Sequence, residues 1–173
     1  MFTDIVLIKD KKEAIELSKR LGYSNVLFLT ERNFISNIKD INKAQKPIIV
    51  IGGNDDINRA ALSNSKVNIL LHPETNKHNG LNQVLCKLAH DNNVAIGISF
   101  NKILNEKDRI NLLSKIIQNI RLCRKYKVKV IIASFANNIY EMRSAKDLIS
   151  FMRVLGSTPL DAKNSLLLNN KII

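Results

Sequence analysis

The chain has 173 residues, of which 45% are hydrophobic; this is enough for one sizeable core, so we expect a single domain over residues 1–173. Lys and Arg number 27 against 15 Asp and Glu, and the net charge of +12 indicates a polyanionic partner, with plain solvation of the surface as the alternative. No apolar run approaches the roughly 20 residues of a membrane span, and residues 1–10 lack the basic and apolar regions of a signal peptide, so we expect a cytoplasmic protein.

Short apolar runs alternate with helical patterns along the chain. The expected strands are Thr3–Ile8, Asn25–Leu29, Pro47–Ile51, Val67–Leu71, Val94–Ile98 and Val128–Ala133. The expected helices are Lys11–Leu21, Glu31–Ala44, Asp55–Ser63, Leu81–Asp91, Lys107–Tyr126, Ala145–Leu155 and Leu160–Leu168. The strand runs are continuous Val, Ile and Leu rather than alternating apolar and polar residues, which indicates a parallel sheet buried on both faces.

Right-handed βα crossovers leave two architectures, an open doubly wound sheet or a closed barrel. No G-x-G-x-x-G motif follows the first strand, and Gly52-Gly53 is typical of a tight turn, so a dinucleotide-binding sheet has little support. A barrel usually takes about 200–250 residues and eight strands, whereas this chain is shorter and shows six strand runs. These patterns leave both architectures open.

The carboxyl ends of the expected strands, where parallel α/β folds place their working surface, are small and polar. They carry Thr30, Gly52, His72, Ser99 and Ser134. A hydrolytic metal site needs about three or four His, Asp or Glu ligands, and of the three histidines only His72 follows a strand. Ser134 lacks the G-x-S-x-G nucleophile elbow. Cys86 and Cys123 fall on apolar helix faces, so we expect both to be reduced residues of the core. We therefore expect no catalytic residue and no metal site.

The basic residues near the end of the helix expected over Lys107–Tyr126 are the positive signal. Arg121, Arg124 and Lys125 stand at i, i+3 and i+4, so they project together from the last turn. Favourable interaction with the helix dipole explains one or two such charges. The run continues through Lys127 and Lys129, a series that can track several phosphates, so we predict RNA contacts for Arg121, Arg124, Lys125 and Lys127.

Arg143 is the strongest single candidate for RNA binding. It precedes Ser144, a good N-cap, and Asp147 follows in a capping-box arrangement, so the guanidinium is expected at a fixed helix entrance. A fixed fork suits bidentate phosphate binding, and an ion pair with Glu141 or Asp147 is the alternative. His72 is a further candidate, which either contacts RNA or satisfies a backbone group. With three Tyr, six Phe and no Trp, binding is expected to read the shape and phosphates of a folded RNA.

Three segments in this order resemble one known family: K-L-A-H-D-N-N-V-A-I from Lys87, L-C-R-K-Y-K-V-K-V-I-I-A-S from Leu122 and E-M-R-S-A-K-D-L from Glu141. The chain resembles the RNase P protein component 3 family, most specifically over residues 67–156. That resemblance implies a TIM-like parallel β/α barrel of the type found in the polymerase and histidinol phosphatase superfamily, with an imperfect strand count. Active members of the superfamily begin with D-L-H-x-H, and here apolar Val6 and Ile8 replace both histidines. Asp4 remains, and we expect it to be a capping or turn residue. The chain is short for the family, and Ala145 replaces its usual Pro.

The resemblance implies a protein subunit of ribonuclease P, an endoribonuclease that matures precursor tRNA and whose catalyst is its RNA with bound magnesium. The chain itself is then expected to bind no cofactor and to be inactive alone. Implied partners are RNase P RNA, precursor tRNA indirectly, and the ferredoxin-like RNase P protein component 2, in a heterotetramer. Two alternatives remain: a metal-dependent phosphoesterase of the same superfamily, and a small-molecule α/β enzyme with a polar pocket at the strand ends.

Overall fold

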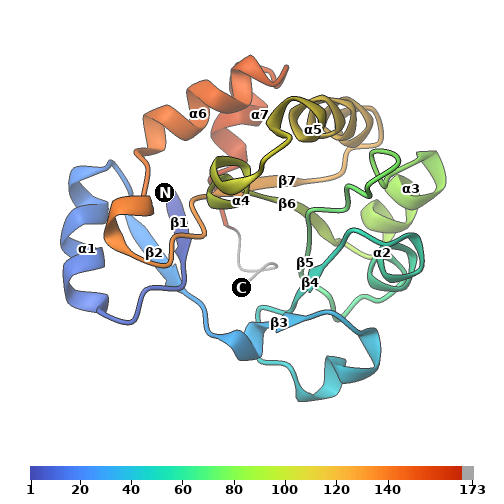
Figure 1. Cartoon of the computed structure of the whole chain (residues 1–173), viewed down its shortest axis with the longest axis horizontal. Helices are drawn as coiled ribbons and strands as arrows, with labels where there is room; N and C mark the ends of the chain where they lie inside the picture. Colours follow the sequence, from blue (N-terminus) through green and yellow to red (C-terminus); the bar gives the residue numbers. More distant parts are fainter. Residues whose placement is uncertain (169–173) are drawn as a thin grey trace.

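The structure is a computed structural model that describes residues 1–168, and its elements alternate as β/α units (Figure 1). The strands are β1 (Thr3–Val6), β2 (Asn25–Phe28), β3 (Phe34–Ile35), β4 (Ile49–Ile51), β5 (Ile69–Leu71), β6 (Ala95–Ser99) and β7 (Val130–Ala133). The α-helices are α1 (Lys11–Arg20), α2 (Asp55–Leu62), α3 (Gln83–Asp91), α4 (Phe100–Asn105), α5 (Arg109–Lys125), α6 (Ala145–Val154) and α7 (Pro159–Asn164). Three 3-10 helices are η1 (Glu31–Asn33), η2 (Ile38–Lys43) and η3 (Ile139–Glu141).

All strand pairs are parallel, and the strands curve into a partial barrel. One sheet has the order β1-β2 and the other β3-β4-β5-β6-β7. Beyond β7 the chain returns to β1, where Phe135 N donates to Ile5 O and Leu7 N donates to Ala136 O, each over 2.8 Å. The ring therefore continues from β7 to β1 and is interrupted between β2 and β3. This arrangement confirms the TIM-like barrel with fewer than eight strands and excludes the open doubly wound sheet.

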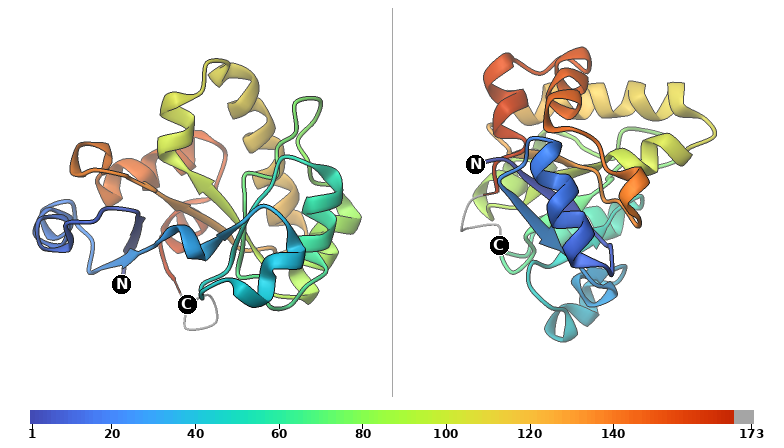
Figure 2. Two further views of the ribbon diagram at one scale, coloured as in Figure 1. Left: turned by 60° about the horizontal axis from the view of Figure 1, so that its bottom comes forward. Right: turned by 90° about the vertical axis from the view of Figure 1, so that its left-hand side faces the viewer.

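The continuous apolar runs bury both faces of each strand. Ile69 and Leu71 of β5 point into the barrel and pack in one cluster with Ile5, whereas Leu70 between them packs outward in the cluster that contains residues of α2 and α3. In Figure 1 the helices surround the strands, and in the left view of Figure 2 α1 lies on the opposite side of the strands from α2 and α3. The interior is tight at Gly97, where a Cβ would lie 2.7 Å from Ile69 Cγ2.

All six expected strands are present; each is one to two residues shorter at one end, and β6 extends one residue further at the other. The helix expected over Glu31–Ala44 is wrong, because η1, β3 and η2 occupy this segment. Its polar side chains bind the backbone in place of helical hydrogen bonds: Asn33 Oδ1 accepts from Thr30 N over 2.8 Å, and Asn37 Oδ1 accepts from Lys39 N. The helix α4 was not expected, and the last helix ends at Asn164 rather than Leu168.

Two further expectations concern membrane spans and cysteines. Within residues 1–168 no helix is long and apolar enough to span a membrane. Cys86 on α3 and Cys123 on α5 are both free and buried in one hydrophobic cluster, which places them in the core as expected.

Candidate RNA interface

The carboxyl ends of the strands surround an open cavity of about 400 Å³ with an apolar floor. Leu7, Leu71 and Phe135 line it from within the barrel, and Asn101 and Asn137 lie at its edge. Among residues 1–168 no three His, Cys, Asp or Glu side chains come together in a way that could hold a metal ion. Glu31 and Lys102 are the charged residues on the lining, and one acid falls short of the three or four ligands that a hydrolytic metal site needs.

Asp4 joins β1 to the segment that follows β7. It is fully buried, its Oδ1 accepts from Ile5 N over 2.9 Å and from Ser134 N over 2.8 Å, and its Oδ2 accepts from the Ser134 hydroxyl over 2.7 Å. Burial raises the pKa of Asp4 to about 6, against the lowering effect of these hydrogen bonds. The expectation of a helix cap or turn was wrong, because the carboxylate bonds across the sheet to the segment after β7.

His72 lies inside the protein and braces two strand ends. It is 2% exposed; its Nε2 accepts from Ser99 N over 2.9 Å, and its Nδ1 lies 3.2 Å from Glu74 Oε2. Because a backbone N–H can only donate, Nε2 is the acceptor, so Nδ1 carries the proton and donates a hydrogen bond to Glu74. Glu74 in turn accepts from Asn119 of α5. The prediction of an RNA contact is corrected: His72 is buried and both of its ring nitrogens are engaged, so it satisfies a backbone group, the alternative reading.

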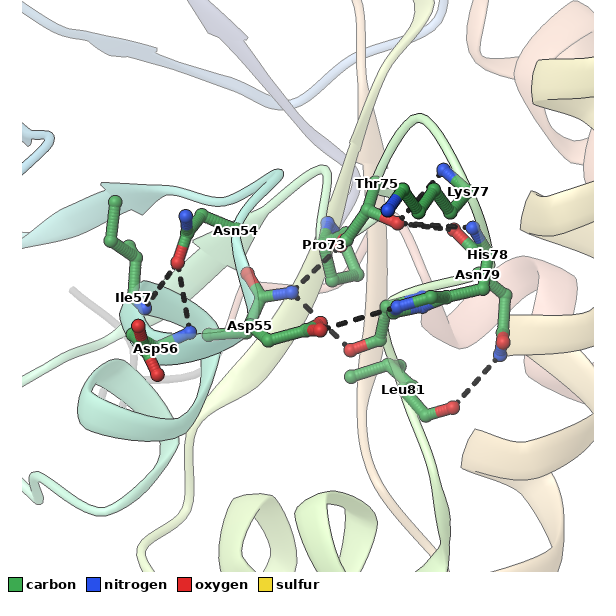
Figure 3. A network of polar contacts seen from close by, with 12 residues as sticks. Asn54, Asp55, Asp56, Ile57, Pro73, Thr75, Lys77, His78, Asn79 and Leu81 are labelled. Atoms are coloured by element: carbon green, nitrogen blue, oxygen red, sulfur yellow. Dashed lines mark hydrogen bonds and ion pairs between the residues drawn. The ribbon is translucent and has the colours of Figure 1, made fainter.

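The loop after His72 is folded against the start of α2 (Figure 3). Asn54 caps α2 by accepting from Asp56 N over 2.9 Å, and Asp55 Oδ2 lies 3.2 Å from His78 Nε2. The other ring nitrogen of His78 accepts from Gly80 N, which fixes the tautomer that donates to Asp55. His78 is therefore a structural residue of the loop.

A lysine from α5 holds the same loop from the other side. Lys115 Nζ donates to the carbonyl oxygens of Thr75 and Asn76 over 3.0 and 3.2 Å. Sequence reasoning missed this contact, since the two partners lie about 40 residues apart in the chain and no local pattern joins them.

The four basic residues predicted at the end of α5 are all exposed: Arg121, Arg124, Lys125 and Lys127. Arg124 Nη1 reaches Gly156 O at 3.4 Å, and Lys125 Nζ lies 5.7 Å from the centroid of the Tyr126 ring. Lys127 has φ +56°, the left-handed turn that leads from the helix into β7. Within residues 1–168 no carboxylate lies within ion-pair distance of these four cations, so their charges remain available to an anion.

Arg143 sits at the entrance of α6, as predicted. Ser144 Oγ accepts from Asp147 N over 3.1 Å, which confirms the N-cap. Arg143 Nη1 donates to the carbonyl oxygens of Tyr140 and Met142, and the guanidinium carbon lies 5.7 Å from the centroid of the Phe100 ring. The alternative of an ion pair with Glu141 or Asp147 is not what the described residues show. These two backbone carbonyls therefore fix one nitrogen of the Arg143 guanidinium group.

The structure does not bring Arg143 together with the other four cations. Lys127 and its neighbours precede the amino end of β7, whereas Arg143 follows its carboxyl end. The four residues of β7, at about 3.3 Å each, separate the two groups by roughly 13 Å along the strand direction. The chain thus presents two basic sites, which we call the α5 site (Arg121, Arg124, Lys125 and Lys127) and the Arg143 site.

Comparison with known proteins agrees with this fold and with the resemblance in the sequence. The family model for RNase P subunit p30 matches residues 27–173. Ribonuclease P protein component 3 of Methanosarcina mazei is 42% identical over 121 residues, which are 69% of this chain and 51% of that protein. The counterpart in Methanococcus vannielii is 31% identical over 155 residues, 83% of this chain and 67% of that protein.

A solved structure has the same fold as this chain. A chain in the cryo-EM structure of archaeal Ribonuclease P with mature tRNA matches with a TM-score of 0.79 and 28% identity, over 94% of this chain and 86% of that one. This chain spans about half the length of the first curated relatives it matches. The family model and the curated relatives together show that the chain belongs to the RNase P subunit p30 family.

Proposed function

We propose that this chain is a protein subunit of ribonuclease P that binds and stabilises the RNA which removes the 5′ leader from precursor tRNA. The observation that carries the proposal is the match over 94% of the chain to a component of an archaeal Ribonuclease P structure. The charge supports it, since +12 on a folded domain favours a polyanion.

The arrangement of the cations supports phosphate contacts in particular. The α5 site leaves four exposed cations without a carboxylate partner in the described chain, and the Arg143 site holds a guanidinium at a capped helix entrance. Cations that neutralise RNA phosphates release counterions, and this release drives binding at low salt. The barrel places the two sites rigidly, so they suit a folded RNA rather than a flexible strand.

Catalysis in the proposed complex belongs to the RNA and its magnesium ions, and the chain alone is inactive and binds no cofactor. The lining of the barrel mouth supports this assignment, because a hydrolytic metal site would need three or four His, Asp or Glu ligands and Glu31 is the one acid among the lining residues. The proposed protein partner is the ferredoxin-like RNase P protein component 2, in a heterotetramer, in the cytoplasm. Metal-dependent phosphoesterase chemistry has no such support from the residues at the barrel mouth.

Co-purification and reconstitution test the proposal. The tagged full chain is expressed with RNase P RNA and component 2, both untagged, and both are expected to co-purify with it. Adding the chain to RNA and component 2 is expected to raise the initial rate of precursor tRNA cleavage at limiting magnesium. If neither the RNA nor component 2 is retained at low salt, and cleavage is unchanged by the chain, the proposed function is wrong.

A further inference from the structure

A second cavity, distinct from the barrel mouth, lies beside the α5 site. It encloses about 280 Å³ between the end of α5, the start of β7 and the connection from α6 to α7. Arg124, Lys127 and Lys129 line it, and buried Ile120 and Met152 form part of its inner wall. Two exposed cations of the α5 site thus face the same hollow as a third cation that is only partly exposed.

Lys129 is the best-fixed cation of the three. Its backbone carbonyl accepts from Ile96 N over 2.9 Å, so it is held by the neighbouring strand β6. Its Nζ donates to Leu167 O, and an ammonium group has two further N–H groups for another acceptor. Burial lowers the pKa of Lys129, and an anion in the cavity would oppose that shift by stabilising the charged form.

The cavity carries an excess of positive charge. Asp161 is the one acid among its lining residues, against three cations, and its Oδ2 accepts from the Thr158 hydroxyl over 2.7 Å. Within residues 1–168 none of the three cations lies within ion-pair distance of a carboxylate. Apolar walls reduce the local dielectric constant, which strengthens the interaction of these cations with an anion. The hollow therefore has the charge and shape for a small anionic group.

We propose that this cavity binds one phosphodiester group of an RNA backbone, held by Lys129 from within and by Arg124 and Lys127 at the rim. This inference rests on the proposed function and adds a site to it. Ser157, also on the lining, supplies a hydroxyl that can donate to a phosphate oxygen. The partly buried Lys129 gives this contact a fixed position, whereas Arg121 and Lys125 lie outside the cavity lining and serve the surrounding phosphates.

Charge-neutral variants test the cavity. The full chain carries Lys129→Gln or Lys127→Gln, and Lys87→Gln on the exposed side of α3 is the matched control that also removes one charge. Affinity for RNase P RNA is measured over a series of salt concentrations. Each cavity variant is expected to make the log-log salt slope less negative than that of Lys87→Gln, by at most about 0.7–0.9, the value for one phosphate contact. Lys129→Gln is expected to weaken binding roughly tenfold at low salt, since a charge-assisted bond is lost.

A phosphate-interference experiment locates the contact. RNA with single ethylated phosphates is bound by wild-type protein and by each variant. One position is expected at which ethylation weakens binding to the wild type but has no further effect on Lys129→Gln. If Lys129→Gln unfolds at a lower temperature because it loses its bond to Leu167, a second variant keeps the test decisive. In that case Lys127→Gln is tested for the same loss of the ethylation effect, since the exposed Lys127 side chain does not bond to Leu167.

The outcomes separate this inference from the proposed function. If the wild type binds the RNA while both cavity variants match Lys87→Gln in affinity and slope, the cavity is not a phosphate site but the function stands. If the wild type does not bind the RNA, both fail. Titration with adenosine monophosphate is the last arm: tight binding that depends on Lys129, without coupling to any RNA phosphate, would assign the cavity to a free nucleotide and overturn the RNA assignment.

Discussion

The Ser134 hydroxyl donates to the carboxylate of Asp4 over 2.7 Å, and this bond joins the first strand of the barrel to the segment that follows the last. Ser134 N donates to the other oxygen of the same carboxylate over 2.8 Å. A buried carboxylate that accepts these bonds is costly to ionise, since desolvation outweighs the hydrogen bonds and raises its pKa to about 6. The closure of the barrel is therefore sensitive to pH.

Stability is expected to fall as pH rises from about 4 to about 6. Asp4 has an ordinary pKa of 3.8 and a folded pKa of about 6, so the folded protein binds more protons in this window. The stabilisation that protonated Asp4 contributes to the free energy of unfolding is fully present below pH 3.8 and is lost above about pH 6. It amounts to about 3 kcal/mol. Urea unfolding of wild type and Asp4→Asn between pH 4 and 8 measures it. Asp4→Asn should remove this component, and an equal pH dependence in both proteins would contradict the assignment.

Arg143→Ala is expected to slow reconstituted precursor tRNA cleavage at limiting magnesium far more than Lys12→Ala, an exposed residue on α1. Arg143→Ala removes a fixed guanidinium and with it a charge-assisted contact to RNA of about 1.5–3 kcal/mol, whereas a mobile surface lysine contributes little. Arg121→Ala and Arg124→Ala should fall between them, and high magnesium should partly rescue Arg143→Ala. Initial rates at several magnesium concentrations measure the order. A wild-type rate together with a lowered melting temperature would make Arg143 a purely structural residue.

Affinity for RNase P RNA is expected to depend steeply on salt. About five phosphate contacts from the two basic sites predict a log-log slope of roughly −3 to −5. Filter binding or fluorescence anisotropy over a salt series measures the slope. A flat profile would show that the charge of +12 serves solubility.

Replacing His72 is expected to lower stability without changing RNA affinity. His72→Ala leaves the buried N–H of Ser99 unpaired, at a cost of roughly 1–3 kcal/mol, and removes one hydrogen bond from the Glu74 carboxylate, which keeps its bond from Asn119. Thermal unfolding and RNA binding of the folded variant, each below its melting temperature, separate the two effects. Loss of RNA affinity at unchanged stability would restore His72 to the RNA interface.

The RNA-free chain is expected to hydrolyse neither precursor tRNA nor a phosphomonoester, because among residues 1–168 no three His, Cys, Asp or Glu side chains come together to hold a metal ion. Purified protein is assayed with added magnesium, manganese or zinc, and with and without a chelator. Robust hydrolysis that the chelator abolishes would contradict this prediction.

The strands were predictable from sequence because their apolar runs are buried on both faces, so burial dominates local preference there. The segment 31–44 was not, since its side chains such as Asn33 and Asn37 bind the backbone and end each turn early. The role of Asp4 was also beyond sequence, because its partner Ser134 lies 130 residues away. The continuation of the sheet from β7 to β1 likewise consists of contacts between residues about 130 apart in the chain, which no local pattern reveals.

The candidate RNA interface was likewise predictable from sequence only where it depends on local patterns. The exposed cations at the end of α5 and the capped position of Arg143 follow from helix periodicity and capping, which are local. The separation of these two basic sites by β7, and the burial of His72, depend on how neighbouring strands pair in the sheet. Lys129 was counted with the surface charges in the sequence, and only the packing of α5 against the connection between α6 and α7 shows the hollow that it faces.

The placement of the two basic sites on either side of β7 has a consequence for affinity. If both sites bind RNA as proposed, the barrel fixes the spacing of the two contacts at roughly 13 Å along β7, so a bound RNA has to present two phosphates at that spacing. Once one end is bound, the second contact forms within the complex, at an effective concentration set by the RNA fold. Two individually weak contacts then give strong avidity for correctly folded RNA and little for an unfolded one.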